Sequence, residues 1–310
     1  MGARLGRLRQ PLRRADHHGP AVLWSDRPAL RRPRPGAGLA ERHGALVTAL
    51  EQTLDTPVAS APQGLSVQAR RVSHAFTTKT GQLPVLDEVS FTIEAGEFVA
   101  LLGPSGCGKS TLLRLLSGLD APREGKIGAD GVRITGPDPS RLLVFQDPTL
   151  YPWRSVRQNL AVGLETRGVL KAQKGRIDEI LRLVGLEAFA DALPHELSGG
   201  MAQRAALGRV LVNDPRLLLL DEPLGKLDAL TRMTLQEELL KIWQARRFTS
   251  VLVTHDVEEA LLLAQRILVF SDRPARIIRE LAVPLDYPRR REDPVFVALR
   301  QEILSGLAPH

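Results

Sequence analysis

GPSGCGKST, which runs from Gly103 to Thr111, is the stretch of this sequence that decides the fold. It matches G-x-x-x-x-G-K-[ST], the pattern of a loop whose glycines let several backbone N–H groups point at one phosphate. The aliphatic run FVALL (98–102) precedes it and the helix-like TLLRLLSGL (111–119) follows it. We therefore expect a phosphate-binding loop between a buried strand and a helix, whose positive N-terminal end also favours an anion. All nine residues are candidate nucleotide contacts: Gly103, Pro104, Ser105, Gly106, Cys107, Gly108, Lys109, Ser110 and Thr111.

Further aliphatic runs, separated by helical stretches, indicate a parallel sheet that is covered on both faces. These runs lie at 142–145, 217–220, 250–253 and 267–270. In an open parallel sheet, ligands bind beyond the carboxyl ends of the strands. The polar residues that follow three of the runs are Gln146, the pair Asp221 and Glu222, and His255 after Thr254. Their convergence at one edge carries more weight than any single motif.

Three of these residues would handle the charge of the phosphates. Lys109 would place its ammonium on the β- and γ-phosphates, and Ser110 would offer its hydroxyl to Mg²⁺. Asp221 would hold the same Mg²⁺ through water, although an Asp-Glu pair after a strand is also a common turn. Cys107 is expected to point away from the phosphates, which makes a catalytic thiol a poor interpretation.

Three others would act on the attacking water and the γ-phosphate. Glu222 would orient or deprotonate the water, and Gln146 could reach both the water and Mg²⁺. His255 could hydrogen-bond the γ-phosphate, a positioning role typical of phosphoryl transfer. Taken alone, Gln146 could simply be solvated and His255 could form a surface pair with Asp256.

An antiparallel pair of strands is expected before the phosphate loop. RVSHAF (71–76) and VSFTIEAG (89–96) are the two segments, and the second alternates apolar and polar residues. Phe76 stands at the end of the first segment, before the loop TTKTGQ. It could stack on an adenine ring or pack into the core.

Composition limits the remaining possibilities. The chain has 310 residues, 43% of them hydrophobic, and one cysteine, which excludes an internal disulfide.

Its net charge of +7 comes from residues 1–44, which contain ten arginines and three acidic residues. We interpret residues 1–64 as a basic, disordered extension; contact with anionic lipid or nucleic acid is the alternative. The rest is formally neutral, which argues against a nucleic-acid partner. No apolar run reaches the roughly 18 to 20 residues of a membrane span.

Six motifs in order resemble those of the ATPase subunits of ABC transporters. They correspond to Walker A, Q-loop, signature, Walker B, D-loop and H-loop: GPSGCGKST (103–111), VFQD (144–147), LSGGM (197–201), LLLLDEP (217–223), LGKLDAL (224–230) and VTHD (253–256). The resemblance implies an α/β fold, a RecA-like P-loop NTPase core with an antiparallel β-subdomain and an inserted helical subdomain. The ATPase domain would span 65–275, the insert about 147–196, and a C-terminal helical tail 276–310.

The stretches 145–165 and 293–304 are similar to the branch that imports nitrate, sulfonates and taurine. The resemblance implies an ATPase that uses ATP and Mg²⁺ at the cytoplasmic face of the inner membrane, as a peripheral protein. Its partners would be a second ATPase subunit in a homodimer, two transmembrane permease subunits, and a periplasmic or lipid-anchored solute-binding protein. The membrane subunit would dock near Gln146 to Trp153, where Tyr151 and Trp153 are anchors or core residues. Lys226 departs from the small residue usual in the D-loop.

The signature contains no acid, base or metal ligand. Ser198 can cap a helix, and Gly199 and Gly200 can expose backbone N–H groups at its positive end. These three residues are therefore expected to bind the γ-phosphate of ATP held by the other subunit.

Two other functions share the phosphate loop. A non-transport ABC ATPase acting on DNA or ribosomes would use the arginine-rich extension as its anchor, but such proteins usually carry two cassettes or a long coiled-coil insertion. A small-molecule kinase would need an acceptor pocket and leaves LSGGM without a role.

Overall fold

The computed structural model describes residues 64–79, 81–225 and 227–307. All of them belong to the second of the two units into which the chain divides, Ala45–His310. The expectations for the basic extension up to residue 63 and for Lys226 lie outside the described residues.

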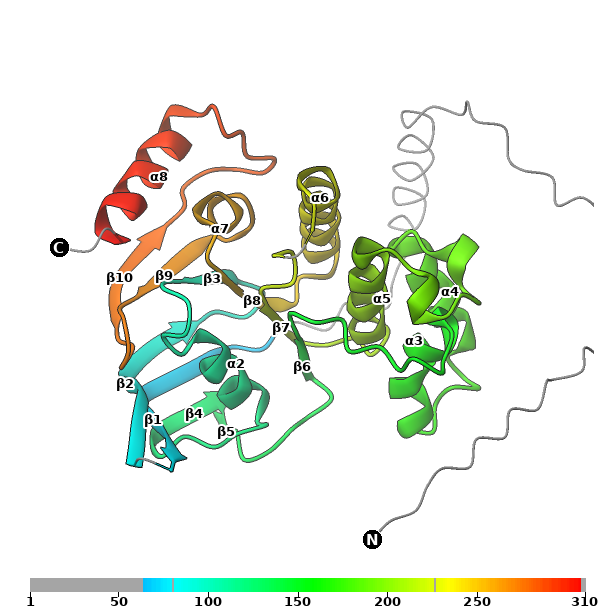
Figure 1. The fold of residues 1–310 in the computed structure, drawn as a ribbon, viewed down its shortest axis with the longest axis horizontal. Coiled ribbons are helices and arrows are strands. Elements are labelled where there is room, and N and C mark those ends of the chain that lie inside the picture. The colour runs from blue at the N-terminus through cyan, green and yellow to red at the C-terminus, as the bar shows by residue number, and fades with distance from the viewer. Residues whose placement is uncertain (1–63, 80, 226, 308–310) are drawn as a thin grey trace, which may run out of the picture. The chain divides into compact units, whose positions relative to one another are not determined.

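The larger of two sheets forms the centre of this unit (Figure 1). Its strand order is β10 (Ile277–Ala282), β9 (Arg266–Phe270), β3 (Phe98–Leu102), β8 (Thr249–Thr254), β7 (Leu217–Asp221) and β6 (Arg141–Val144). The pairs from β9 to β6 are parallel, as predicted from the aliphatic runs, and β10 is antiparallel to β9. The carboxyl ends of β3, β6, β7 and β8 therefore meet at one edge.

Successive residues of β3 enter two different apolar cores. Phe98, Ala100 and Leu102 are buried in the core that the sheet shares with the helices, whereas Val99 and Leu101 are buried in the core shared with α2 and the smaller sheet. Side chains alternate along a strand, so an apolar residue at every position indicates packing on both faces. This is why the central strands read as continuous aliphatic runs.

The smaller sheet is antiparallel and covers helix α2 (Lys109–Ser117), which follows the phosphate loop. Its order is β2 (Gly81–Ile93), β1 (Val67–Thr78), β4 (Glu124–Ala129) and β5 (Val132–Arg133). The pairing of β1 with β2 confirms the antiparallel pair expected before the loop. Phe76 lies opposite Leu83 in this pair.

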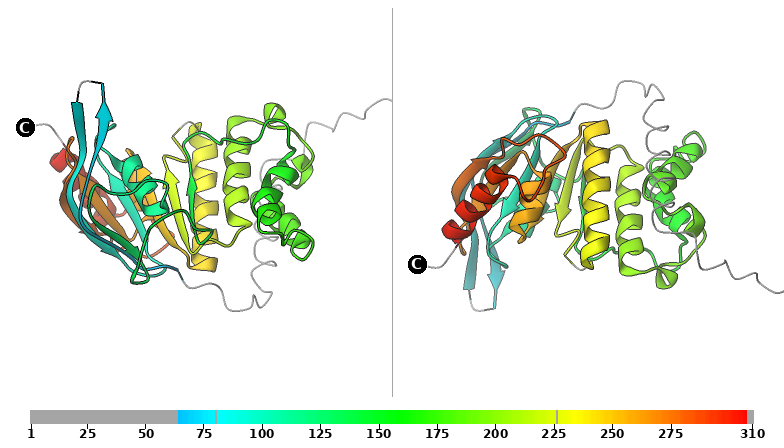
Figure 2. Two further views of the ribbon diagram at one scale, coloured as in Figure 1. Left: turned by 90° about the horizontal axis from the view of Figure 1, so that it is seen from below. Right: turned by 90° about the horizontal axis from the view of Figure 1, so that it is seen from above.

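Helices cover the opposite face of the larger sheet and form a block at its β6 end (Figure 2). The face is covered by α6 (Ala229–Arg246), α7 (Val257–Leu263) and α8 (Pro294–Leu307). The block consists of α3 (Val156–Thr166), α4 (Lys174–Leu183), α5 (Gly199–Leu211) and the short 3-10 helices Glu187–Phe189 and Pro194–Glu196. None of the helices in the described part of the chain is long and apolar enough to cross a membrane.

The C-terminal residues correct one expectation. A helical tail was expected over 276–310, but its first residues form strand β10, which extends the sheet beyond β9. β10 supplies hydrogen-bond partners to the free edge of β9, which would otherwise be unpaired. Its pattern gives little sequence signal because most of its residues are exposed and Leu281 alone is buried. The helix α8 follows only after residue 293.

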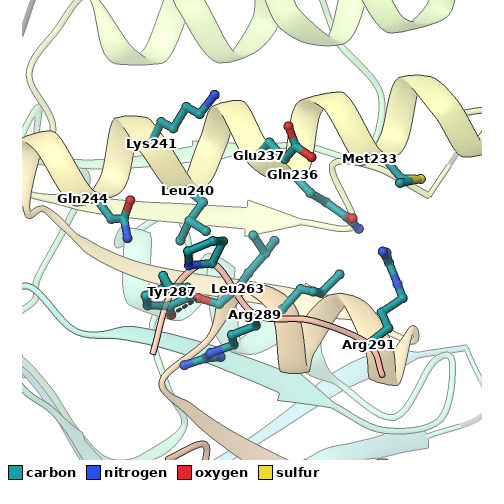
Figure 3. Close-up of a pocket in the computed structure, with 12 residues that line it drawn as sticks. Met233, Gln236, Glu237, Leu240, Lys241, Gln244, Leu263, Tyr287, Arg289 and Arg291 are labelled. Carbon is teal, nitrogen blue, oxygen red and sulfur yellow. Dashed lines mark hydrogen bonds between the residues drawn. The ribbon is translucent and has the colours of Figure 1, made fainter. Parts of the chain in front are cut away.

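The segment after β10 fastens α7 to the sheet and borders a cavity of about 480 Å³ against α6 (Figure 3). The Tyr287 hydroxyl donates to the Leu263 carbonyl oxygen at 2.7 Å, and Arg289 donates to the Leu261 carbonyl oxygen at 2.7 Å. These carbonyls belong to the last turn of α7, where the helix itself offers no N–H donor to the carbonyl oxygens. Burial raises the pKa of Tyr287 to about 12, so the hydroxyl remains a donor at neutral pH.

Tyr287→Phe is expected to lower the free energy of unfolding by about 1 kcal/mol, because it leaves the Leu263 carbonyl without that donor. For a domain of this size the melting temperature should fall by about 2–4 °C. Tyr151→Phe is the matched control, since no hydrogen bond of its hydroxyl is found among the described residues. Equal melting temperatures for the two variants would show that the Tyr287 hydrogen bond contributes nothing.

Candidate functional site

The phosphate loop connects β3 to α2 in a conformation that its glycines make possible. Gly108 has φ +131°, and a Cβ at this position would lie 2.7 Å from Cγ1 of Val85. A side chain here would therefore be both strained and blocked. The loop can curl so that its backbone N–H groups face one anion, as the motif predicts.

Lys109 and Cys107 are both buried at this loop, and their side-chain tips approach each other. The Lys109 Nζ is buried and donates to the carbonyl oxygens of Gly103 and Pro104, both at 2.7 Å. The Cys107 side chain is buried in the apolar core beneath the loop, with its Sγ 3.9 Å from Lys109 Nζ. The ammonium is thus held within the loop, and the thiol packs in the apolar core with its sulfur facing that ammonium.

Ser110 and Asp221 form a second polar pair beside the loop. The Ser110 hydroxyl donates to Oδ1 of Asp221 at 2.8 Å. Burial raises the pKa of Asp221, the hydrogen bond from Ser110 opposes this effect, and the charge of Glu222 raises the pKa further. The two side chains, 111 positions apart in the sequence, meet because β3 and β7 both flank β8.

Gln146, Glu222 and His255 come together at the same edge. Glu222 Oε2 lies 3.3 Å from Nδ1 of His255 and accepts a 3.4 Å hydrogen bond from Nε2 of Gln146. Glu222 has φ +45°, a left-handed conformation that is costly for a residue with a side chain, and its N–H donates to the Val253 carbonyl at 3.0 Å. This backbone bend directs the carboxylate toward residues that follow β6 and β8.

A pocket of about 190 Å³ opens beside the loop, and Phe76 lines it. The Phe76 ring is 41% exposed and meets His74 edge-on at a centroid distance of 5.0 Å, so it is not a core residue. The pocket also contains Leu83, Val85 and Arg273, which the sequence reasoning missed. A predicted pairing of β2 with β1, the strand that carries Phe76, could have placed Leu83 and Val85 near the pocket. No local sequence pattern points to Arg273.

Ser198, Gly199 and Gly200 do not line this pocket. Ser198 is the N-cap of α5 and accepts from the Met201 N–H at 3.3 Å. Ser198 and Gly199 are exposed, and a Cβ on Gly199 would meet nothing within 4 Å. Gly200, which was also expected to be exposed, is buried, and a Cβ there would lie 2.6 Å from Cγ2 of Thr231. Ser198 and Gly199 are thus the signature residues that face the outside of the subunit.

Comparisons with known proteins agree with this geometry. The family model described as ABC transporter matches residues 86–225. The aliphatic sulfonates import ATP-binding protein SsuB of Bacillus cereus is 43% identical over 241 residues, which cover 78% of this chain and 95% of that protein. This chain belongs to the ABC-transporter ATP-binding proteins. The taurine import ATP-binding protein TauB of Roseobacter denitrificans is 45% identical over 251 residues, covering 78% of this chain and 93% of that protein.

A solved relative shows the same fold with nucleotide products. The ATP-binding cassette MJ0796, in a dimeric post-hydrolysis state bound to ADP and Pi, superimposes with a TM-score of 0.64 and 31% identity, covering 71% of this chain and 100% of that one. The ABC protein described here is therefore an ATPase with a P-loop NTPase core.

The residues of this ABC ATPase fit a magnesium ion. The described residues hold no cluster of three His, Cys, Asp or Glu side chains that could bind a metal by themselves. The Ser110–Asp221 pair instead offers hard oxygen atoms next to the phosphate loop, so the remaining ligands would come from phosphate and water. Ser110, Gln146 and Asp221 are the residues that would hold the ion, which would neutralise phosphate charge.

Asp221→Asn is expected to stabilise the nucleotide-free protein at pH 7 while it abolishes ATP hydrolysis. A raised pKa means that keeping Asp221 ionised in the fold costs free energy above that pKa. As the pH falls through the raised pKa, folded Asp221 binds a proton and the cost disappears. The variant should therefore melt at a higher temperature than wild type at pH 7, and the difference should shrink as the pH is lowered toward the raised pKa of Asp221.

Asp120→Asn serves as the control with the opposite sign. The hydrogen bond from Arg114 lowers the pKa of Asp120, so its ionised form is favourable and the substitution should give no gain in melting temperature. A lower melting temperature for Asp221→Asn at pH 7 would contradict the assigned cost of burying Asp221.

Proposed function

We propose that this ABC ATPase powers the uptake of a small anion, such as a sulfonate, taurine or nitrate, through separate membrane subunits. Its partners are a second copy of the chain, two transmembrane permease subunits, and a periplasmic or lipid-anchored solute-binding protein. Its place is the cytoplasmic face of the inner membrane. The close sequence similarity to import ATP-binding proteins named for sulfonates and taurine supports this assignment.

The cluster of Gln146, Glu222 and His255 carries the proposed mechanism. Glu222 accepts the proton of the attacking water, because its carboxylate is the basic group at the centre of the cluster. Gln146 orients that water, and His255 positions the γ-phosphate for in-line attack. Lys109 and the N–H groups of the loop hold the β- and γ-phosphates, and Phe76 stacks on the adenine.

The open N-terminus of α5 supports a head-to-tail dimer. Ser198–Gly200 cannot serve the pocket of their own subunit, since that pocket is lined without them. In a head-to-tail pair they would instead meet the γ-phosphate bound by the partner. Each ATP would then lie between the phosphate loop of one subunit and the signature of the other. ATP binding would in this way hold the two subunits together.

An apolar surface near the Q-loop supports contact with a permease subunit. A cavity of about 480 Å³ is lined by β6 and the loop before it, by the end of α2 and by the end of α3, and Leu119 and Phe145 line it while remaining exposed. Trp153 is 72% exposed, and Tyr151 lies between the guanidinium groups of Arg154 and Arg209. An exposed tryptophan whose ring contacts a neighbouring tyrosine, here at a centroid distance of 5.5 Å, is the kind of anchor that protein interfaces use.

Trp153→Ala is expected to reduce co-purification with the proposed membrane subunit by at least about tenfold, since interface tryptophans often contribute about 2 kcal/mol or more. The ATPase rate of the isolated subunit should stay within about twofold of wild type. Val132→Ala is the control, because Val132 is 71% exposed on β5, outside the six motifs. Normal co-purification of Trp153→Ala would place the permease contact elsewhere.

Uptake tests the proposed function itself. The full chain is reconstituted with the neighbouring membrane subunits and solute-binding protein in ATP-loaded vesicles. Accumulation of labelled taurine, an alkanesulfonate or nitrate that depends on Glu222 supports the proposal. ATP hydrolysis without uptake of any of the three would overturn the proposed solute class.

A further inference from the structure

The connection between β9 and β10 places one arginine at the nucleotide pocket. Arg273 shares this pocket with Phe76 and with Ser105, Lys109 and Thr111 of the phosphate loop. It follows β9, the strand next to β3, so its connection leaves the sheet beside the phosphate loop. The approach is close, since a Cβ on Gly103 would lie 2.9 Å from the Phe270 carbonyl oxygen.

Among the described residues, Arg273 differs from the neighbouring arginines in having no partner. Arg266 pairs with Glu97, Arg276 with Asp87, and Arg279 with Glu302. Within the residues that the structure describes, Arg273 makes no hydrogen bond and no ion pair, and it is exposed. The guanidinium of Arg273 can therefore contact a bound anion without breaking an ion pair.

The backbone around Arg273 is nevertheless fixed. The Ser271 N–H donates to the Arg276 carbonyl at 2.9 Å, which closes the turn. The Ala275 N–H donates to the Val85 carbonyl at 2.8 Å, and the Asp87 N–H donates to the Ala275 carbonyl at 3.0 Å. Because Val85 itself lines the pocket, the turn that carries Arg273 is tied to the pocket wall.

We propose that Arg273 binds the phosphate chain of the nucleotide, as a cationic contact additional to Lys109. The planar guanidinium matches phosphate oxygens in a two-pronged geometry and cannot lose its charge near neutral pH. A fixed turn limits the ordering cost of the contact to the side chain itself. The inference rests on the proposed placement of ATP between Phe76 and the phosphate loop.

Binding of Mg·AMP-PNP to the full chain, measured by calorimetry, tests the contact. Arg273→Gln should raise Kd about tenfold, the size expected for a charge-assisted hydrogen bond. It should also weaken the dependence of Kd on salt, because a charge is removed. Arg273→Lys should bind between wild type and the glutamine variant. Arg133→Gln, at an exposed position in β5 away from the pocket, should bind as wild type does.

Two outcomes overturn the proposal. One is a Kd within twofold of wild type for Arg273→Gln. The other is an equal loss in the lysine and glutamine variants with an unchanged salt dependence, which would indicate stacking on the base instead. The variants Lys109→Ala and Phe76→Ala separate this inference from the site assignment. If both variants bind the nucleotide as wild type does, the proposed nucleotide site is wrong. If both bind it weakly while Arg273→Gln binds it normally, only the arginine contact is rejected. Unchanged melting temperatures would show that the variants are folded.

Discussion

Glu222→Gln is expected to lower the rate of ATP hydrolysis at least about a hundredfold while ATP still binds, because general bases commonly contribute factors of about 10² to 10⁴. The amide keeps the size of the side chain and can still contact Gln146 and His255, but it cannot accept the proton of the attacking water. The phosphate loop, which binds the nucleotide, is unchanged. Bound ATP should therefore accumulate together with the dimer that it holds.

The rate is measured as phosphate release, and dimer formation as the mass of the ATP-bound protein in solution. Glu237→Gln is the matched control, since Glu237 is exposed on α6 and lies away from the phosphate loop. The control should hydrolyse ATP at the wild-type rate. Normal hydrolysis by Glu222→Gln would remove Glu222 from the role of base.

Ser198→Arg is expected to abolish hydrolysis to a similar extent without weakening nucleotide binding to the isolated subunit. Ser198 is exposed at the N-terminus of α5 and does not line the pocket beside the phosphate loop, so the first binding step has no need of it. A long side chain there would block the γ-phosphate of the partner's ATP. The loss of aligned donors at such a site typically costs about 10² to 10³ in rate.

Ser155→Arg controls for the loss of a helix cap. Ser155 caps α3 as Ser198 caps α5, with its side chain accepting from the Gln158 N–H. Both variants should lose similar stability, about 1 kcal/mol. Only the Ser198 variant should lose ATP hydrolysis. An equal loss of hydrolysis in both variants would show that the missing helix cap, and not the blocked γ-phosphate, is the cause.

Much of the site could be predicted because it depends on local sequence at strand ends. The motif around Lys109 fixes its own loop, and continuous aliphatic runs before Gln146, Asp221 and Thr254 indicate parallel strands whose ends share an edge. The order of the strands was not needed for this conclusion. The structure adds the detail that Glu222 contacts both Gln146 and His255.

The remaining features depend on long-range packing and left little trace in the sequence. Strand β10 pairs only at an edge, and most of its side chains are exposed, so it lacks the apolar pattern of the central strands. Arg273 reaches the nucleotide pocket because β9 lies next to β3, an adjacency that no local pattern encodes. Val85 likewise belongs to the pocket through the packing of β2 against the phosphate loop.

The central claim is that Ser198–Gly200 of one subunit complete the Lys109 site of the other. Mixing Ser198→Arg subunits with Lys109→Ala subunits tests it most directly, because each mixed dimer would contain one intact composite site. The two variants alone should be inactive, and an equal mixture should recover up to about a quarter of the wild-type ATPase rate, since about half of the dimers are mixed and each keeps one of two sites. A mixture that hydrolyses no more ATP than the separate variants would contradict the claim.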